Sequence, residues 1–228
     1  MRLKFNLMGI FKGHFILILV VAMFNSKHGS INNIEISEVS NSPSSRWELT
    51  DEEEGIKFYV RWVPISDEQK VRERKVEILA HTSLDNALKM VTDMEKVRLW
   101  MSGIKKASLL HRDSKNQWYS YALYGLPWPF NDREMITLCK MKQEAAQPRI
   151  SINMESIDQS YPPAKGVERL TNYKASWELI EINKTLVKMT FIARSGDPPA
   201  FPRVIQDPVI KKVFMGNMRA LKSLLEKS

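Results

Sequence analysis

The side chains that most often carry out catalysis are few and scattered in this sequence. Of the four histidines, His14 and His28 precede the predicted folded domain, and His81 and His111 are thirty residues apart. Cys139 is the only cysteine, so the chain can form no internal disulfide and no cluster of thiolate ligands. The sequence has no triad or metal-ligand spacing and no glycine-rich phosphate loop. We therefore predict no catalytic residue, no metal and no other cofactor.

Arg133 and Glu134 form an adjacent pair of opposite charges that could polarise a substrate. At a turn, such a pair is more often structural. We expect Arg133 to bond loop carbonyls or a nearby acid.

Side chains that repeat every second residue indicate strands with one face suited to apolar contacts. Between residues 133 and 144, one face would carry Met135, Thr137, Cys139 and Met141. The other face ends in lysines and should reach solvent there, so we assign the face with Thr137 and Cys139 to the interior. The next two strands would place on one face Ile150, Ile152 and Met154, and then Tyr173, Ala175 and Trp177. Trp177 would either line a binding site or belong to an ordinary core.

Two predicted helices accompany these strands. Residues 83–101 repeat apolar side chains at three- and four-residue spacing, with Ser83 as the N-cap. Residues 208–227 form the second helix, with a stripe of Ile210, Phe214, Asn217 and Leu221. The predicted strands cover residues 55–63, 71–80, 107–113, 117–126, 133–144, 149–158, 169–182 and 185–195.

The order of these elements indicates the fold class. A long antiparallel sheet twists and curls, and a helix on its concave side would cover its apolar face. We therefore predict an α+β helix-grip fold, in which a curved antiparallel β-sheet wraps around a long C-terminal α-helix.

The first thirty residues have the layout of a targeting segment. A cationic stretch is followed by ten consecutive apolar residues at 15–24. This run fits the apolar region of a secretory signal, about 7–15 residues, better than a membrane span of about 20. No small-x-small cleavage site follows it, so the segment could also remain as an anchor. We predict a signal peptide or N-terminal membrane anchor over 1–30, a linker over 31–46 and one domain over 47–228, in an exported (periplasmic or secreted) or membrane-anchored protein.

The charge distribution argues against nucleic acid as a partner. The formal net charge is +8, but the first thirty residues contribute four of these charges, and the rest of the chain is only mildly basic. Lys and Arg are spread among acids, without an Arg-rich arm or the aromatic and basic strand motif of an RNA reader.

Four segments, in this order and spacing, carry a resemblance to a known family. They are Trp47 followed by GIKFYVRWV and RERKVEILA, the helix end VRLWM, the turn and strand YGLPWPFNDREMITL, and GDPPAFPRVI leading into MGNMRALKSLL. Over residues 47–226 the chain resembles the StAR-related lipid transfer (START) family of the helix-grip (Bet v 1-like) superfamily, as a bacterial-type single-domain member.

The resemblance implies an internal cavity between the sheet and the C-terminal helix, closed by loops, that holds one lipid or other apolar small molecule. Methionine, of which the chain has twelve, suits the lining of such a cavity because its thioether is flexible. We predict as ligand-binding residues Thr137, Cys139, Met141, Met154, Tyr173, Trp177, Ile210, Phe214, Asn217 and Leu221.

Aromatic residues in proline-rich loops are further candidates. We assign Trp128, Phe130 and Phe201, together with Arg133, to a loop or lid. Exposed loop aromatics could contact a membrane surface, where one side of the ring is apolar and the other wet. Alternatively, these rings fold inward and cap the sheet.

Three hypotheses follow. The first is a non-enzymatic protein that binds, and in one version transports, an apolar molecule. The second is a cyclase- or hydrolase-type enzyme that uses the same cavity, and the third is a structural interaction protein. Two or more ionisable groups converging in the cavity would favour the enzyme, and an apolar wall with one or two polar groups would favour the carrier.

Overall fold

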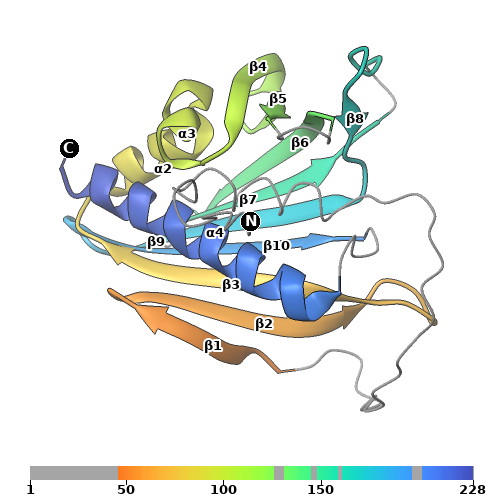
Figure 1. Ribbon diagram of the computed structural model, residues 1–228. Coiled ribbons are helices and arrows are strands. Elements are labelled where there is room, and N and C mark those ends of the chain that lie inside the picture. Colours follow the sequence, from red (N-terminus) through yellow and green to blue (C-terminus); the bar gives the residue numbers. More distant parts are fainter. Residues whose placement is uncertain (1–45, 126–130, 145–147, 159–160, 197–201, 228) are drawn as a thin grey trace, which may run out of the picture.

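The computed structural model describes residues 46–125, 131–144, 148–158, 161–196 and 202–227, and its main feature is one large curved sheet (Figure 1). The strands follow the order β1-β2-β3-β10-β9-β7-β6-β5-β4, all antiparallel, and the short β8 pairs with β6 in parallel. Their bounds are β1 (Glu48–Glu53), β2 (Ile56–Pro64), β3 (Lys70–Ala80), β4 (Ile104–Ser114), β5 (Gln117–Tyr124), β6 (Arg133–Glu144), β7 (Arg149–Ser156), β8 (Glu168–Arg169), β9 (Tyr173–Asn183) and β10 (Leu186–Ser195).

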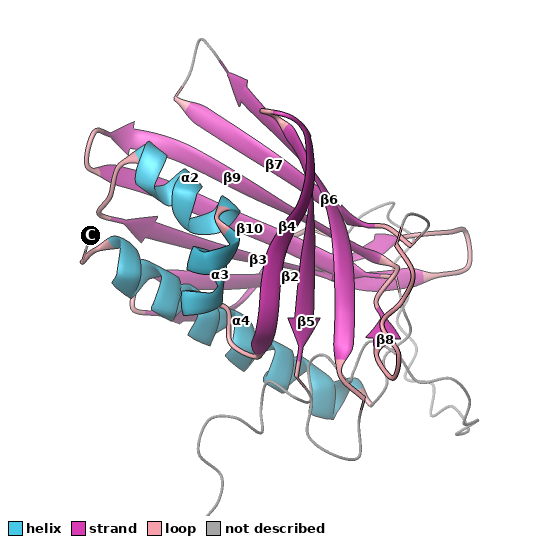
Figure 2. Ribbon diagram, turned by 90° about the horizontal axis from the view of Figure 1, so that it is seen from above, coloured by secondary structure: helices cyan, strands magenta, loops and turns pink. Residues whose placement is uncertain are grey.

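In the described chain, three helices lie on one face of the sheet, inside its curve (Figures 1 and 2). They are α2 (Leu84–Thr92), α3 (Met94–Trp100) and α4 (Arg203–Leu225). The long α4 runs across β2 and β3, and the pair α2 and α3 sits beside it. A curved antiparallel sheet around a long C-terminal helix confirms the predicted α+β helix-grip fold.

The prediction of one continuous helix over 83–101 is wrong, because the chain breaks at Asp93. Ser83 caps α2 as predicted, accepting a hydrogen bond from the Asn86 N–H at 3.2 Å. Asp93 has extended backbone angles, and its carboxylate accepts the Glu95 N–H at 3.0 Å. The side chain of an Asp competes with helix continuation in this way, so Asp93 ends α2 and caps α3.

The last helix begins earlier than the sequence predicts. The expected start was near Pro208, since proline favours the first turn of a helix. In the structure α4 starts at Arg203, and Pro208 lies inside it. Contacts from other elements hold this extra turn, because Asp207 accepts from Arg74 of β3 at 2.9 Å and Gln206 is buried.

Two strands were not predicted. β1 has the sequence ELTDEE, without the alternation typical of a strand, and it pairs with β2 at the edge of the sheet. Its acids face basic residues of α4, with Lys211 at 2.9 Å from Asp51 and Arg219 at 2.6 Å from Glu53. β8 has only two residues, and its pairing with Arg133 and Glu134 of β6 brings the segment before it against the sheet.

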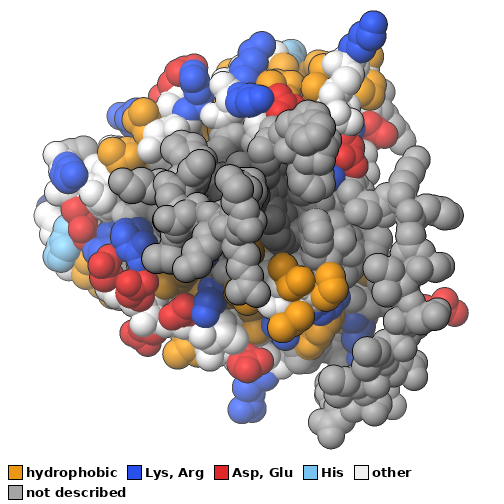
Figure 3. Space-filling model, viewed as in Figure 1, with side chains coloured by type: hydrophobic (Ala, Val, Ile, Leu, Met, Phe, Trp, Pro, Cys, Tyr) orange, Lys and Arg blue, Asp and Glu red, His pale blue; other side chains and the backbone are white. Residues whose placement is uncertain are grey.

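Acidic and basic side chains are interspersed over the described part of the face in Figure 3. On the outer side of the sheet these charges pair, as in Arg61 with Glu73 and Lys75 with Glu77. Within the described residues, no helix has both the length and the apolar character needed to cross a membrane.

Candidate functional site

A cavity of about 190 Å³ lies between the concave face of the sheet and the helices α3 and α4. Each central strand contributes the side chains of one face to the cavity lining, and α4 contributes side chains between Val213 and Met218. Apolar side chains dominate the lining: Val91, Met94, Val97, Trp100, Met101, Ile104, Ala107, Trp118, Ala122, Met135, Ile152, Met154, Leu170, Trp177, Phe191, Ala193, Val213, Phe214 and Met218. An apolar cavity with a small number of polar groups is the usual form of a small-molecule site.

A row of aromatic rings forms one wall of the cavity. Phe191 lies between Trp177 and Phe214, with ring centroids 4.7 Å and 5.8 Å away. Trp100 packs edge-on against Trp177 at 6.1 Å, and its indole N–H donates to the Met90 carbonyl at 3.0 Å. These contacts join β9, β10, α3 and α4, so the wall is continuous across elements that are far apart in the sequence.

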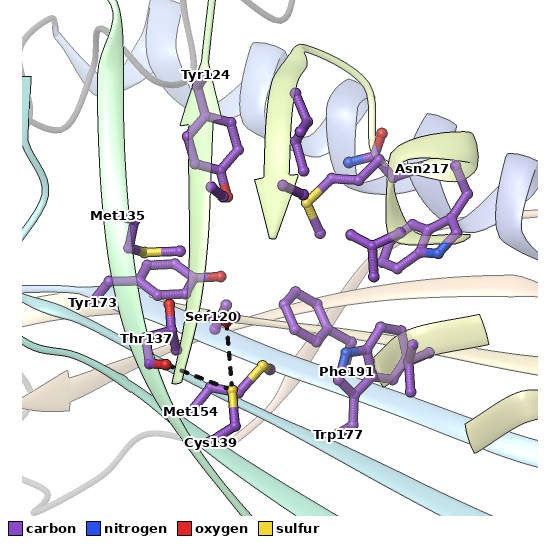
Figure 4. A pocket seen from close by; sticks show the side chains of 18 of the residues that line it. Ser120, Tyr124, Met135, Thr137, Cys139, Met154, Tyr173, Trp177, Phe191 and Asn217 are labelled. Carbon is purple, nitrogen blue, oxygen red and sulfur yellow. Dashed lines mark hydrogen bonds between the residues drawn. The ribbon is translucent and has the colours of Figure 1, made fainter. Parts of the chain in front are cut away.

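β5 and β6 form another wall of the cavity, and its small side chains are those of Ser120, Ala122, Thr137 and Cys139. Trp118 pairs with Cys139 in the register of the two strands, and Ser120 pairs with Thr137. The Ser120 hydroxyl lies 3.8 Å from the Cys139 sulfur, and both point into the cavity (Figure 4). Burial raises the pKa of the Cys139 thiol to about 11, so at neutral pH it is a protonated, weakly nucleophilic group.

The structure brings most of the predicted ligand-binding residues together. Those that line the cavity are Thr137, Cys139, Met154, Tyr173, Trp177, Phe214 and Asn217 (Figure 4). Asn217 also has a structural contact, since its side-chain oxygen accepts from the backbone N–H and the hydroxyl of Ser102, at 3.1 Å and 2.7 Å. This contact ties α4 to the turn between α3 and β4, at the rim of the cavity.

Three predicted residues do not line the cavity. Met141 is on the same face of β6 as Cys139 but is half-buried near the end of the strand, where it packs against the core. Ile210 and Leu221 are fully buried on α4. The cavity extends along α4 only from Val213 to Met218, and a stripe of one helix face continues beyond both ends of it. The prediction assigned the whole stripe of the helix to the cavity, but the cavity is shorter than the stripe.

The assignment of Arg133 to a loop or lid is wrong, because Arg133 is the first residue of β6, but the expected bond to a nearby acid is confirmed. Arg133 is buried, and its guanidinium lies 2.9 Å from a carboxylate oxygen of Glu168. The pairing of β8 with the start of β6 places that acid beside it. The other predicted loop or lid residues, Trp128, Phe130 and Phe201, lie outside the described residues, as does the segment 1–45.

Several polar groups gather at one end of the cavity. Tyr124 ends β5 and Tyr173 begins β9, and both hydroxyls point into the cavity (Figure 4). Burial raises the pKa of Tyr124 to about 12. Burial also raises the pKa of Tyr173, with a further increase from the neighbouring Tyr124. Both phenols are therefore neutral hydrogen-bond donors at physiological pH.

Arg74 of β3 is the buried cation at the same end. Its guanidinium donates to Asp207 of α4 at 2.9 Å. Burial lowers the pKa of Arg74, and the repulsion from Arg72 and Arg203 lowers it further, against the attraction of Asp207. Arg72 also contacts Asp207, at 3.7 Å, so at least two guanidinium groups share this carboxylate.

Sequence reasoning predicted the strand β5 and helical structure over α3, but it assigned no residue of either element to the cavity, and it did not single out Arg74. In QWYSYALY each face carries two aromatic residues, so the alternation does not tell which face is internal. Arg74 lies in a strand rich in charged residues, where an arginine normally indicates a solvent-facing position. Its partner, Asp207, is 133 positions away, and only the fold brings the two together.

Among the described residues, no group of three or more His, Cys, Asp or Glu side chains is placed to hold a metal ion. The described part of the cavity lining contains no Asp, Glu or His.

No protein-family model matches the sequence, and a comparison with curated proteins finds no match. Solved structures, however, are similar to the fold. The STAR-related lipid transfer protein from Xanthomonas axonopodis is 25% identical with a TM-score of 0.68, over 78% of this chain and 98% of that chain. Human StAR-related lipid transfer protein 5 is 14% identical with a TM-score of 0.67, over 79% and 86%. Human STARD10 is 16% identical with a TM-score of 0.65, over 78% and 71%.

The curved sheet, the long C-terminal helix and the apolar cavity between them define a helix-grip domain. The similarity to the bacterial lipid transfer protein, together with the START-like segments in the sequence, supports membership in the START helix-grip family, and the human structures share its fold.

Proposed function

We propose that this protein binds a lipid or another apolar small molecule in the cavity between the sheet and α4 and carries it without changing it chemically. The observation that carries the proposal is the cavity itself: about 190 Å³ of space lined mainly by aromatic, aliphatic and Met side chains. Each methylene of a ligand that leaves water for such a lining contributes about 0.8 kcal/mol. The names of similar proteins, which are lipid transfer proteins and domains, support the same function.

The state of the ionisable groups in the lining supports a carrier over an enzyme. The Cys139 thiol and the phenols of Tyr124 and Tyr173 all have raised pKa values, so each is protonated at neutral pH. Protonated thiols and phenols are poor nucleophiles and poor general bases. Arg74 is paired with Asp207. The arrangement is suited to hold a ligand rather than to transform it.

A fluorescence titration tests the proposal. Trp100, Trp118 and Trp177 line the cavity, so a dansyl-labelled fatty acyl probe bound there will accept energy from them. We expect saturable binding of one probe per chain, and competition by unlabelled lipids. Mass spectrometry of the probe after incubation should show it unchanged. Absence of saturable binding would refute the carrier, and conversion of a bound lipid would favour the enzyme.

We further propose that the protein delivers or collects its ligand at a membrane surface, outside the cytoplasm, to which residues 1–30 direct it. The first turn of α4 supports a membrane contact, since Val204 is 81% exposed and Ile205 51% exposed beside Arg203. Exposed aliphatic groups next to a cation suit a lipid interface. In flotation with anionic vesicles, the change Val204→Asp together with Ile205→Asp should release the protein. Equal flotation of this variant and the wild type would contradict the membrane contact.

A further inference from the structure

Three polar groups of the cavity, those of Tyr124, Tyr173 and Arg74, gather at the end formed by the last residue of β5 and the first residue of β9, whereas Ser102 and Asn217 lie at the rim beside α3 and α4. Ser156 of β7 connects to this end, since its hydroxyl accepts from the Tyr173 N–H at 2.8 Å. Ser195, at the end of β10, pairs with Tyr173 in the sheet register. The rings of Trp177 and Phe191 lie away from Tyr124 and Tyr173 (Figure 4), and Trp100 packs against Trp177. A molecule that fills the cavity would therefore have one apolar part and one polar end.

The tyrosine hydroxyls at this end face the cavity. Tyr124 and Tyr173 point their hydroxyls into the same space, where a bound ligand could accept hydrogen bonds from both (Figure 4). Both phenols are protonated, as their raised pKa values require. A protonated phenol that faces the cavity can donate to an acceptor on a ligand, and the hydrogen bond is stronger when that acceptor is ionised.

The charge around this end is positive. Arg74 lines the cavity close enough to Tyr173 to favour the ionised phenol electrostatically. Besides the effect of burial, Arg72 and Arg203 lie close enough to Arg74 to lower its pKa by repulsion, and the carboxylate of Asp207 pairs with both Arg72 and Arg74. Such an excess of cations over acids stabilises a negative group and disfavours an ammonium group.

We propose that the ligand is an apolar molecule that ends in a carboxylate, and that the hydroxyls of Tyr124 and Tyr173 both donate hydrogen bonds to that carboxylate. This inference rests on the proposed function and specifies its ligand class. A carboxylate accepts at two oxygens and donates nothing, so it matches two converging donors in a positive field. A quaternary ammonium end would meet donors and cations only.

Competition against a neutral dye tests the inference. Nile red, which carries no charge, reports occupation of the apolar part of the cavity. Its displacement gives the affinities of three twelve-carbon competitors: dodecanoate, methyl dodecanoate and dodecyltrimethylammonium. We expect wild-type protein to bind dodecanoate at least about tenfold more tightly than the other two. The double variant Tyr124→Phe with Tyr173→Phe should lose about tenfold or more in affinity for dodecanoate, with little change for the other two competitors or the dye.

Tyr119→Phe is the matched control, because Tyr119 is on β5 but on the face opposite to Tyr124, outside the cavity. This variant should bind all three competitors like the wild type. Equal wild-type affinities for dodecanoate and dodecyltrimethylammonium, or an unchanged preference in the double variant, would overturn the inference while leaving the carrier function intact. If neither Nile red nor any competitor binds, the proposed function and the inference both fail. The wild-type series decides the question of ligand class even where the double variant does not fold.

Discussion

Small side chains at facing positions keep the cavity open. Ser120 on β5, Cys139 on β6 and Ala193 on β10 all line it, where larger residues would fill the space between sheet and helix. Protein interiors are otherwise close-packed, so an unfilled volume of this size needs such residues around it. Cys139 is the most informative of them, since it is 3% exposed and belongs to the buried core cluster, yet it also lines the cavity.

Cys139→Trp should therefore fill space that a ligand would occupy. We expect loss of binding of a fluorescent fatty acyl probe with a change in melting temperature of only a few degrees, because the ring enters the cavity. Leu179→Trp is the matched control: Leu179 is fully buried in the core and does not line the cavity. Overpacking there should cost about 1–3 kcal/mol. Intact probe binding by Cys139→Trp, with a melting temperature as low as that of Leu179→Trp, would mean that Cys139 belongs to ordinary core.

Period-two reasoning on single strands located part of this site. The faces of β6, β7 and β9 with Cys139, Met154 and Trp177 were identified because lysines or glutamates occupy the other face. Tyr124 and Arg74 could not be found in this way, since a tyrosine at a strand end fits either face and an arginine in a strand normally indicates solvent. Their role depends on partners contributed by other strands and by α4.

At the scale of elements, a buried acid connects β6 to the segment 161–170 on the side away from the cavity. Glu134 is 1% exposed, and its carboxylate accepts hydrogen bonds from two guanidinium nitrogens of Arg169, from Nε at 2.9 Å and from Nη2 at 2.7 Å. It also accepts from the Ala164 N–H at 3.1 Å and the Tyr121 hydroxyl at 3.0 Å. Burial by itself raises the pKa of Glu134, but these hydrogen bonds outweigh it, and the pKa in the folded protein is lowered.

Glu134→Gln should therefore destabilise the protein, and the effect should depend on pH. Removing one charge of a buried pair leaves Arg169 with the exposed Asp158, at 3.8 Å, as its acidic partner, and we expect a loss of about 3 kcal/mol in the free energy of unfolding at pH 7. The lowered pKa means that this stabilisation is fully present above the pKa of the unfolded chain and is lost as pH falls through the folded pKa. Urea unfolding at several pH values should thus show wild type and variant converging in acid.

Glu155→Gln is the control for that measurement, because Glu155 pairs with Lys174 on the exposed side of the sheet. It should have little effect at any pH. A difference between wild type and Glu134→Gln that stays constant from pH 7 to pH 3 would contradict the electrostatic account of this cluster.

The elements themselves were predicted well where local pattern decides them and poorly where contacts decide them. β6 and β10 follow alternation, and their predicted bounds match the structure closely. β1 and the first turn of α4 depend on ion pairs with other elements. Asp51 of β1 pairs with Lys211 of α4, and Asp207 of α4 pairs with Arg74 of β3. Those pairs join residues more than one hundred positions apart, so no local sequence window contains them.

At the scale of the whole molecule, the described residues form a large hydrophobic core among themselves. The main cluster of buried hydrophobic residues runs from Ile56 to Leu225 and joins the sheet to all three described helices. Deleting residues 1–30 should accordingly leave a soluble domain that unfolds cooperatively and binds the same probe as the full chain. Circular dichroism and a thermal melt check this, and an unfolded truncated protein would contradict the assignment of the segment as a signal or anchor.

The central claim is that the cavity holds an apolar molecule, and native mass spectrometry of protein purified from its own host tests it most directly. The account predicts a complex of one chain with one ligand, from which organic extraction releases a lipid or other apolar molecule, and it predicts that Cys139→Trp purifies without it. A wild-type protein that shows only the mass of the bare chain, and that takes up no lipid when incubated with a host lipid extract, would contradict the account.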